Sequence, residues 1–145
     1  MDYKLELVLI PVSDVDRAKK FYLEQAGFVL IVDTPIGEAQ RVVQVVPPGS
    51  ECAIGFGTGL TSAAPGAAQG LHLVVPDILA ARAELAGRGV AVSAVRHLES
   101  GTWVDGPDPE RGNYQSFADF TDPDGNIWIL QEVDRSRDDQ VQGQA

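Results

Sequence analysis

Apolar runs and helix-like stretches follow one another in the same order twice along this chain. An apolar run at 5–12 precedes Ser13 and Asp14, and a second run at 70–76 precedes Asp77. Serine and aspartate are common helix N-caps, and both are followed by apolar residues at the three- and four-residue spacing of an amphipathic helix. One strand–helix–strand unit is therefore used twice.

Each copy continues with further apolar runs separated by turn residues. In the first copy the helix ends at Gly27, and the predicted strands cover about 5–12, 28–33, 41–46 and 52–57. In the second copy the helix runs from Asp77 to near Gly87, and the predicted strands cover 70–76, 90–96, 114–121 and 127–133. Both copies thus have the order βαβββ.

These boundaries predict one domain over 1–133. Module one covers about 3–59 and module two about 70–133, and a linker at 58–69 is poor in charge and rich in Gly, Ala and Pro. The polar tail 134–145 is expected to be disordered. A stretch at 97–113 is predicted to be a long loop, and long loops in compact domains are often lids or binding loops.

Charge and composition exclude several classes of partner. The formal net charge is −10, from 21 acidic and 11 basic residues, which disfavours nucleic acid and anionic membranes. No apolar stretch approaches the roughly 20 residues of a spanning helix, and the start lacks the pattern of a signal peptide. We therefore expect a cytoplasmic protein, and the single cysteine, Cys52, rules out a disulfide framework.

Several features together carry a family resemblance. They are the two Val-x-Asp helix starts, the Phe21-Tyr22 pair, the sequence from Leu71 to Val90 and the turn Asp122-Pro123-Asp124-Gly125-Asn126. From Tyr3 to Val133 the chain resembles the vicinal oxygen chelate superfamily, which holds glyoxalase I, bleomycin-resistance proteins, fosfomycin-resistance enzymes and extradiol dioxygenases. The resemblance implies an α+β fold of two tandem βαβββ modules that form a partial-barrel cleft, usually in a homodimer, with a divalent metal or an organic ligand in the cleft.

The metal ligands of that family are replaced in this chain. Members that use a metal place a His seven residues before each helix-capping acid and a Glu four residues after the hairpin glycine, which here gives Leu7, Gly70 and Ile129. A divalent ion needs two or three converging N or O side chains, and one carboxylate on the strand 52–57 would not hold it alone. We expect no metal and no other cofactor.

Polar residues remain one layer beyond the usual metal level. His72 shares a strand face with Gly70, Gln131 shares one with Ile129, and Leu9 takes the matching layer of module one. A few polar groups in an apolar cleft are typical of a pocket for an organic ligand. His72 would orient or deprotonate the ligand, or would be a core histidine bonded to a nearby carbonyl, and Gln131 has a structural interpretation as well.

The stretch 97–113 and its flanks add further candidates. His97 suits acid–base work or a pH-sensitive contact, or it lies on the surface. Trp103 and Tyr114 would close over a flat ligand, or would fasten the loop to the domain or to a dimer partner. Trp128 has the opposite strand parity to Ile129, which indicates packing against a helix or a second subunit.

The leading hypothesis is a homodimeric protein that binds a small organic molecule in its cleft without a metal. The alternative is an enzyme of the superfamily, a lyase, isomerase or dioxygenase, that uses His72 as a catalytic acid or base or in a shifted metal site. A purely structural interaction domain is disfavoured by the long loop. The expected ligand-binding residues are Leu9, His72, His97, Trp103, Tyr114 and Gln131.

Overall fold

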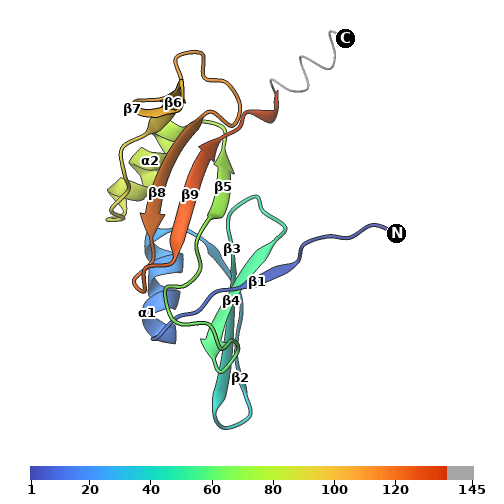
Figure 1. Cartoon of the computed structure of the whole chain (residues 1–145). Coiled ribbons are helices and arrows are strands. Elements are labelled where there is room, and N and C mark those ends of the chain that lie inside the picture. The colour runs from blue at the N-terminus through green and yellow to red at the C-terminus, as the bar shows by residue number, and fades with distance from the viewer. Residues whose placement is uncertain (137–145) are drawn as a thin grey trace. The chain divides into compact units, whose positions relative to one another are not determined.

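The computed structural model describes residues 1–136, so the part of the expected tail from 137 to 145 lies outside the described residues (Figure 1). The fold is α+β. Its elements are β1 (Leu7–Leu9), α1 (Val15–Lys20), the π-helical turn η1 (Phe21–Gln25), β2 (Val29–Ile36), β3 (Gln40–Val46), β4 (Ala53–Thr58), β5 (Leu71–Val75), α2 (Ile78–Gly87), β6 (Arg96–Glu99), β7 (Thr102–Asp105), β8 (Ser116–Thr121) and β9 (Ile127–Glu132). Within residues 1–136 no helix is long and apolar enough to cross a membrane.

The chain divides into two compact units with the same strand order. Unit 1 contains residues 1–69 and 121–127, and unit 2 contains residues 70–120 and the chain from Trp128 onward. The sheet of unit 1 has the order β1-β4-β3-β2, and that of unit 2 has the order β5-β9-β8-β6-β7. The order expected from the repeated sequence pattern is therefore present in each unit, and β7 is an addition to the second.

In unit 1, α1 and the turn η1 that continues it pack on one face of the sheet, and Tyr22 of η1 makes the aromatic contacts. Asp14 caps the helix by accepting a hydrogen bond from the Arg17 backbone N–H. The fully buried Tyr22 stacks on Phe28 and packs on Phe56 of β4, each with ring centroids 5.6 Å apart. The helical apolar spacing of the sequence thus produces the core of this unit.

In unit 2, α2 packs on the face of the sheet that carries Trp128 and Glu132. Asp77 caps α2 by accepting from two of its backbone N–H groups, and the Glu132 carboxylate accepts from the Ile78 N–H at 2.9 Å. Trp128 is 2% exposed and stacks on Phe120. Because Trp128 points to the opposite face of β9 from Ile129, its indole lies in the core of unit 2.

The stretch expected to be a loop contains a β-hairpin. β6 pairs with β7 antiparallel, with Glu99 opposite Thr102, and Ser100 and Gly101 form the turn with φ of 50° and 81°. Two successive positive φ values are typical of the type I′ turns that match the twist of a hairpin. The predicted bounds of the strand 90–96 and of the loop 97–113 are therefore wrong, because the strand begins at Arg96 and ends at Glu99.

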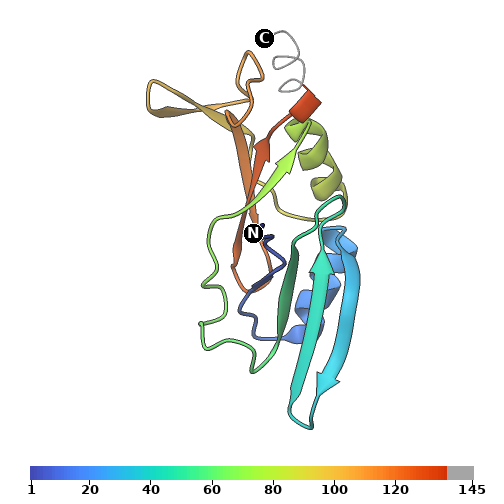
Figure 2. The same ribbon diagram turned by 90° about the vertical axis from the view of Figure 1, so that its right-hand side faces the viewer.

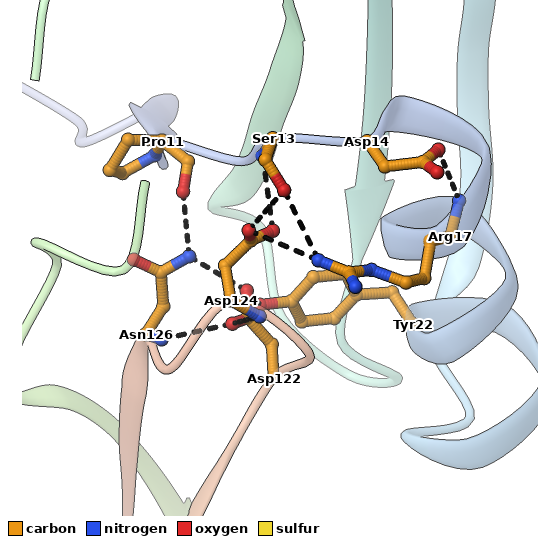
Figure 3. Close-up of polar contacts among 8 residues, drawn as sticks. All are labelled: Pro11, Ser13, Asp14, Arg17, Tyr22, Asp122, Asp124 and Asn126. Atoms are coloured by element: carbon orange, nitrogen blue, oxygen red, sulfur yellow. Dashed lines mark hydrogen bonds and ion pairs between the residues drawn. The ribbon is translucent and has the colours of Figure 1, made fainter. Parts of the chain in front are cut away.

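The turn that joins β8 to β9 packs in unit 1 although both strands belong to unit 2. Asn126, which is fully buried, donates to the Pro11 carbonyl and to Asp122, each at 2.8 Å (Figure 3). The Tyr22 hydroxyl donates to the same Asp122 carboxylate at 2.8 Å. Residues more than a hundred positions apart in sequence thereby hold the start of α1 in place.

Candidate functional site

α2 packs on one face of the unit 2 sheet (Figure 2). We call the other face, which points away from α2, the open face. Along β8 and β9, buried residues alternate with half-buried ones, as expected when only one face of a sheet packs on a helix. The half-buried and exposed residues that share the second face are His72, Val74, Arg96, Leu98, Trp103, Phe117, Asp119, Ile129 and Gln131. Aromatic, apolar and polar side chains are thus mixed on it.

His72 projects from the open face on β5. It lies opposite Ile129 in the parallel β5–β9 pair, as strand parity predicts. The residue is exposed, and its Nδ1 lies 2.7 Å from the Gly70 carbonyl oxygen. The alternative of a core histidine is therefore wrong, although the expected bond to a nearby carbonyl is present.

Gln131 lies two residues after Ile129 on β9, next to Tyr114. Gln131 is opposite Val74, and its Nε2 donates to the Tyr114 carbonyl at 3.2 Å. Tyr114 is 47% exposed and has φ of 68°, a left-handed conformation that costs a non-glycine residue free energy. Its N–H donates to the Glu132 carbonyl at 2.9 Å, which holds that conformation in place.

Trp103 occupies the far side of the open face on β7. The indole is 50% exposed and stands edge to face on Phe117, with ring centroids 5.6 Å apart. The Arg96 guanidinium lies 4.9 Å from the indole centroid and forms an ion pair with Asp119 at 2.9 Å. Half of a large aromatic surface is thus held in one orientation and accessible.

His97 does not join these residues. It lies opposite Ser116 on the α2 side of the sheet and is 4% exposed. Its Nδ1 is 2.7 Å from the Gly106 carbonyl oxygen and its Nε2 is 2.9 Å from Glu99. The hydrogen bond to Glu99, followed by that to Gly106, raises the pKa of His97. The expectations of a ligand contact or of a surface loop residue are corrected, because this imidazole holds the hairpin to the chain after β7.

A buried ion pair that the sequence reading missed holds the segment before Tyr114. Arg111 donates to Glu132, whose side chain is 2% exposed, and to Asp77. The hydrogen bond from Arg111 lowers the pKa of Glu132, and the reverse interaction raises that of Arg111. The sequence signal was the position of Glu132 on the face of its strand that packs on α2. A carboxylate buried there needs a cationic partner.

Leu9 belongs to unit 1, on the sheet face opposite α1. It is 42% exposed, and a Cβ added to Gly55 of β4 would lie 3.1 Å from its side chain. Glycine therefore allows Leu9 to lie flat across the neighbouring strand. Unit 1 also contains a cavity of about 250 Å³, lined by Ser13, Thr58 and Thr61 among others, and none of the expected site residues lines it.

The positions of the family's metal ligands do not fit a metal. Leu7 and Ile129 are hydrocarbon side chains, and Gly70 has none. In the part of the chain that the structure describes, His, Cys, Asp and Glu side chains form no group of three or more that would hold an ion. His72, the only catalytic residue that the sequence predicts, lies opposite Ile129 and diagonally from Gln131.

Comparison with protein families gives one match across most of the chain. Residues 4–130 match the model described as the glyoxalase/bleomycin resistance protein/dioxygenase superfamily. The match covers both units.

Solved structures of similar chains come from several bacteria. TnmS3, described as an antibiotic binding protein from Streptomyces sp. CB03234, is 34% identical, with a TM-score of 0.70 over 90% of this chain and 96% of that one. A glyoxalase/bleomycin resistance protein from the same strain is 35% identical, with a TM-score of 0.68 over 88% and 99%. A superfamily member from Sphaerobacter thermophilus is 27% identical, with a TM-score of 0.69 over 91% and 98%.

Proposed function

Because the chain belongs to the glyoxalase/bleomycin resistance protein/dioxygenase superfamily, we propose that it binds a small organic molecule on the open face of unit 2 and holds it unchanged. One observation carries this proposal: His72, Gln131 and the half-exposed Trp103 share a single sheet face. A surface that combines apolar area with a few placed polar groups is typical of small-molecule sites. The antibiotic-binding description of TnmS3 supports an antibiotic-like ligand for this chain too.

The proposed binding needs no metal. The hydrocarbon and glycine positions at Leu7, Gly70 and Ile129 supply no donor atoms, and so no step of the function is assigned to an ion. Dialysis of the purified protein against a chelator should leave its melting temperature and ligand affinity unchanged. Elemental analysis should give well under one equivalent of Zn, Ni, Mn or Fe per chain. A stoichiometric ion that survives dialysis would contradict this proposal.

The role of Trp103 gives the most direct test of the binding face. Trp103→Ala should weaken the binding of a flat aromatic antibiotic by about 1–3 kcal/mol, because an aromatic contact is lost. The melting temperature should change little, since the indole is half exposed. Affinities are measured by calorimetry against a panel of flat aromatic and glycopeptide antibiotics.

Leu79→Ala is the matched control, because Leu79 is a comparably exposed apolar residue on α2. This variant should bind like the wild type. If Trp103→Ala lowers the melting temperature strongly and leaves affinity intact, the binding face has been placed wrongly.

The alternative of an enzyme rests on the ring of His72, whose Nδ1 is hydrogen-bonded to a carbonyl while Nε2 has no hydrogen-bond partner among residues 1–136. Such a ring nitrogen is able to accept a proton from a bound substrate. Mass spectrometry of ligands recovered after incubation distinguishes the two functions. Unchanged ligand supports binding alone, whereas a product that disappears in His72→Phe would establish catalysis.

A further inference from the structure

The polar atoms of the open face are directed so that they accept hydrogen bonds. We propose that the site recognises its ligand by hydrogen-bond donors, and that the ligands are neutral or cationic aromatic alcohols and amines rather than carboxylates or phosphates. This inference rests on the proposed function, because it names the ligand class of the same face. His72, Gln131 and the ion pair of Arg96 with Asp119 carry it.

The backbone fixes the acceptor on His72. The Gly70 carbonyl oxygen, 2.7 Å from Nδ1, is able only to accept a hydrogen bond, so a neutral ring carries its proton on Nδ1. Nε2 is then an unprotonated acceptor on an exposed side chain. A ligand that meets this atom must bring an O–H or N–H group.

Gln131 is directed in the same way. Its amide nitrogen donates one of its two hydrogens to the Tyr114 carbonyl at 3.2 Å, which orients the amide and fixes the side on which the Oε1 acceptor lies. His72 and Gln131 stand one diagonal step apart on the adjacent strands β5 and β9. Diagonal neighbours in a sheet lie within reach of one aromatic molecule, so a single ligand is able to donate to both.

The charges on the face disfavour anions. Among the five strands of the described unit 2 sheet, Arg96 is the only lysine or arginine. Its guanidinium is paired with Asp119 at 2.9 Å and lies over Trp103. An anionic ligand would therefore meet two acceptor atoms without an unpaired cation to offset its lost hydration, in a chain of net charge −10.

Three naphthalene probes of equal ring size test the inference. 2-Naphthol donates a hydrogen bond, 2-methoxynaphthalene only accepts one, and 2-naphthoate is an anion. Binding is followed through backbone amide shifts of β5 and β9 in NMR titrations. Because a net hydrogen bond is worth about tenfold in affinity at most, 2-naphthol should bind the wild type roughly fivefold to tenfold more tightly than 2-methoxynaphthalene, with 2-naphthoate weakest.

Two variants of His72 separate the acceptor from the rest of the side chain. In His72→Gln the longer amide is able to place an oxygen near the position of Nε2, and so the preference for 2-naphthol should persist. In His72→Asn the shorter amide reaches only the position of Nδ1, and so the preference should fall, with Oε1 of Gln131 as the remaining acceptor. Both variants should fold, because the residue is exposed, and Leu79→Ala should retain the wild-type order.

The outcomes separate the inference from the proposed function. Equal binding of 2-naphthol and 2-methoxynaphthalene to the open face would overturn the inference and leave the function standing. Retention of the full preference in His72→Asn would do the same. If no probe shifts the amides of β5 and β9, both proposals fail.

A readout without ligand tests the first step alone. In nitrogen-15 spectra of the free protein, neutral His72 should show its proton on Nδ1. A proton on Nε2 would overturn the inference, because the exposed ring atom would then be a donor.

Discussion

The two histidines show how strand parity decides the role of a residue. His72 lies on the open face, where two-residue alternation from Gly70 predicts it. His97 faces the α2 side, because it is the second residue of β6, a strand that the sequence reading placed six residues too early. Side chains on opposite faces meet different surroundings, and so His72 is exposed whereas His97 is buried, with an exposed fraction of 4%. Parity predicts a face only when the start of the strand is known.

The carboxylate of Glu99 should control the titration of His97. Its hydrogen bond is the largest cause that raises the pKa of His97 above the usual value. We expect Glu99→Gln to lower the pKa of His97, measured from the imidazole proton shifts across a pH titration. Gly106 keeps its carbonyl bond in this variant, so some elevation of the pKa should remain.

The raised pKa of His97 also predicts the sign of a pH effect on stability. The protonated ring is favoured in the folded state, so its stabilisation is complete below the usual histidine pKa and is lost as pH rises through the raised value. The melting temperature of the wild type, relative to His97→Gln, should therefore decrease as pH rises above the usual histidine pKa and through the raised value. A constant difference would show that the ring is held by packing alone.

At the scale of elements, hydrophobic periodicity predicted the helices and most strands but not the β6–β7 hairpin. The starts of α1 and α2 at Asp14 and Asp77 follow from capping chemistry. The hairpin was missed because its strands are four residues each and contain charged residues instead of an apolar run. Its Ser100-Gly101 turn was the available signal. Strand parity predicts that Glu132 is buried, but that Arg111 is its partner depends on tertiary structure and follows from no local pattern.

The turn between β8 and β9 should contribute strongly to stability. Asn126→Ala removes the side-chain hydrogen bonds to the Pro11 carbonyl and to the Asp122 carboxylate in a fully buried position, and should lower the free energy of unfolding by about 1–3 kcal/mol. Urea denaturation measures this loss.

Arg17→Ala is the control within the same cluster. Arg17 pairs with Asp124 at 3.2 Å, but half of its side chain is exposed, so the loss should stay below about 1 kcal/mol. Equal losses in the two variants would contradict the importance assigned to the buried amide (Figure 3).

At the scale of the whole molecule, the sequence repeat predicted two βαβββ modules, and the residue motifs predicted the family whose model matches residues 4–130. Each unit has its first strand beside its last. The alternative that Trp128 packs against a second subunit is wrong, because its side chain is 2% exposed and stacks on Phe120.

A different surface supports the expected homodimer. Val29, Leu30 and Ile31 lie on the edge strand β2 and are 54%, 40% and 53% exposed. Exposed apolar side chains on an edge strand are typical of interfaces, and twofold symmetry is the commonest solution. Light scattering should give about twice the chain mass of 15.5 kDa, and Ile31→Lys should shift the protein toward the chain mass. A wild-type monomer at tens of micromolar would contradict this prediction.

The place of residues 121–127 within unit 1 has a consequence for synthesis on the ribosome. Residues 1–69 of unit 1 emerge early, but Tyr22 and Pro11 obtain their hydrogen bonds with Asp122 and Asn126 only when these two residues have left the exit tunnel. Unit 1 therefore completes its hydrogen bonds after most of unit 2 has been translated. A gene cut in the linker at 58–69 would separate a first fragment from the turn that completes its hydrogen bonds.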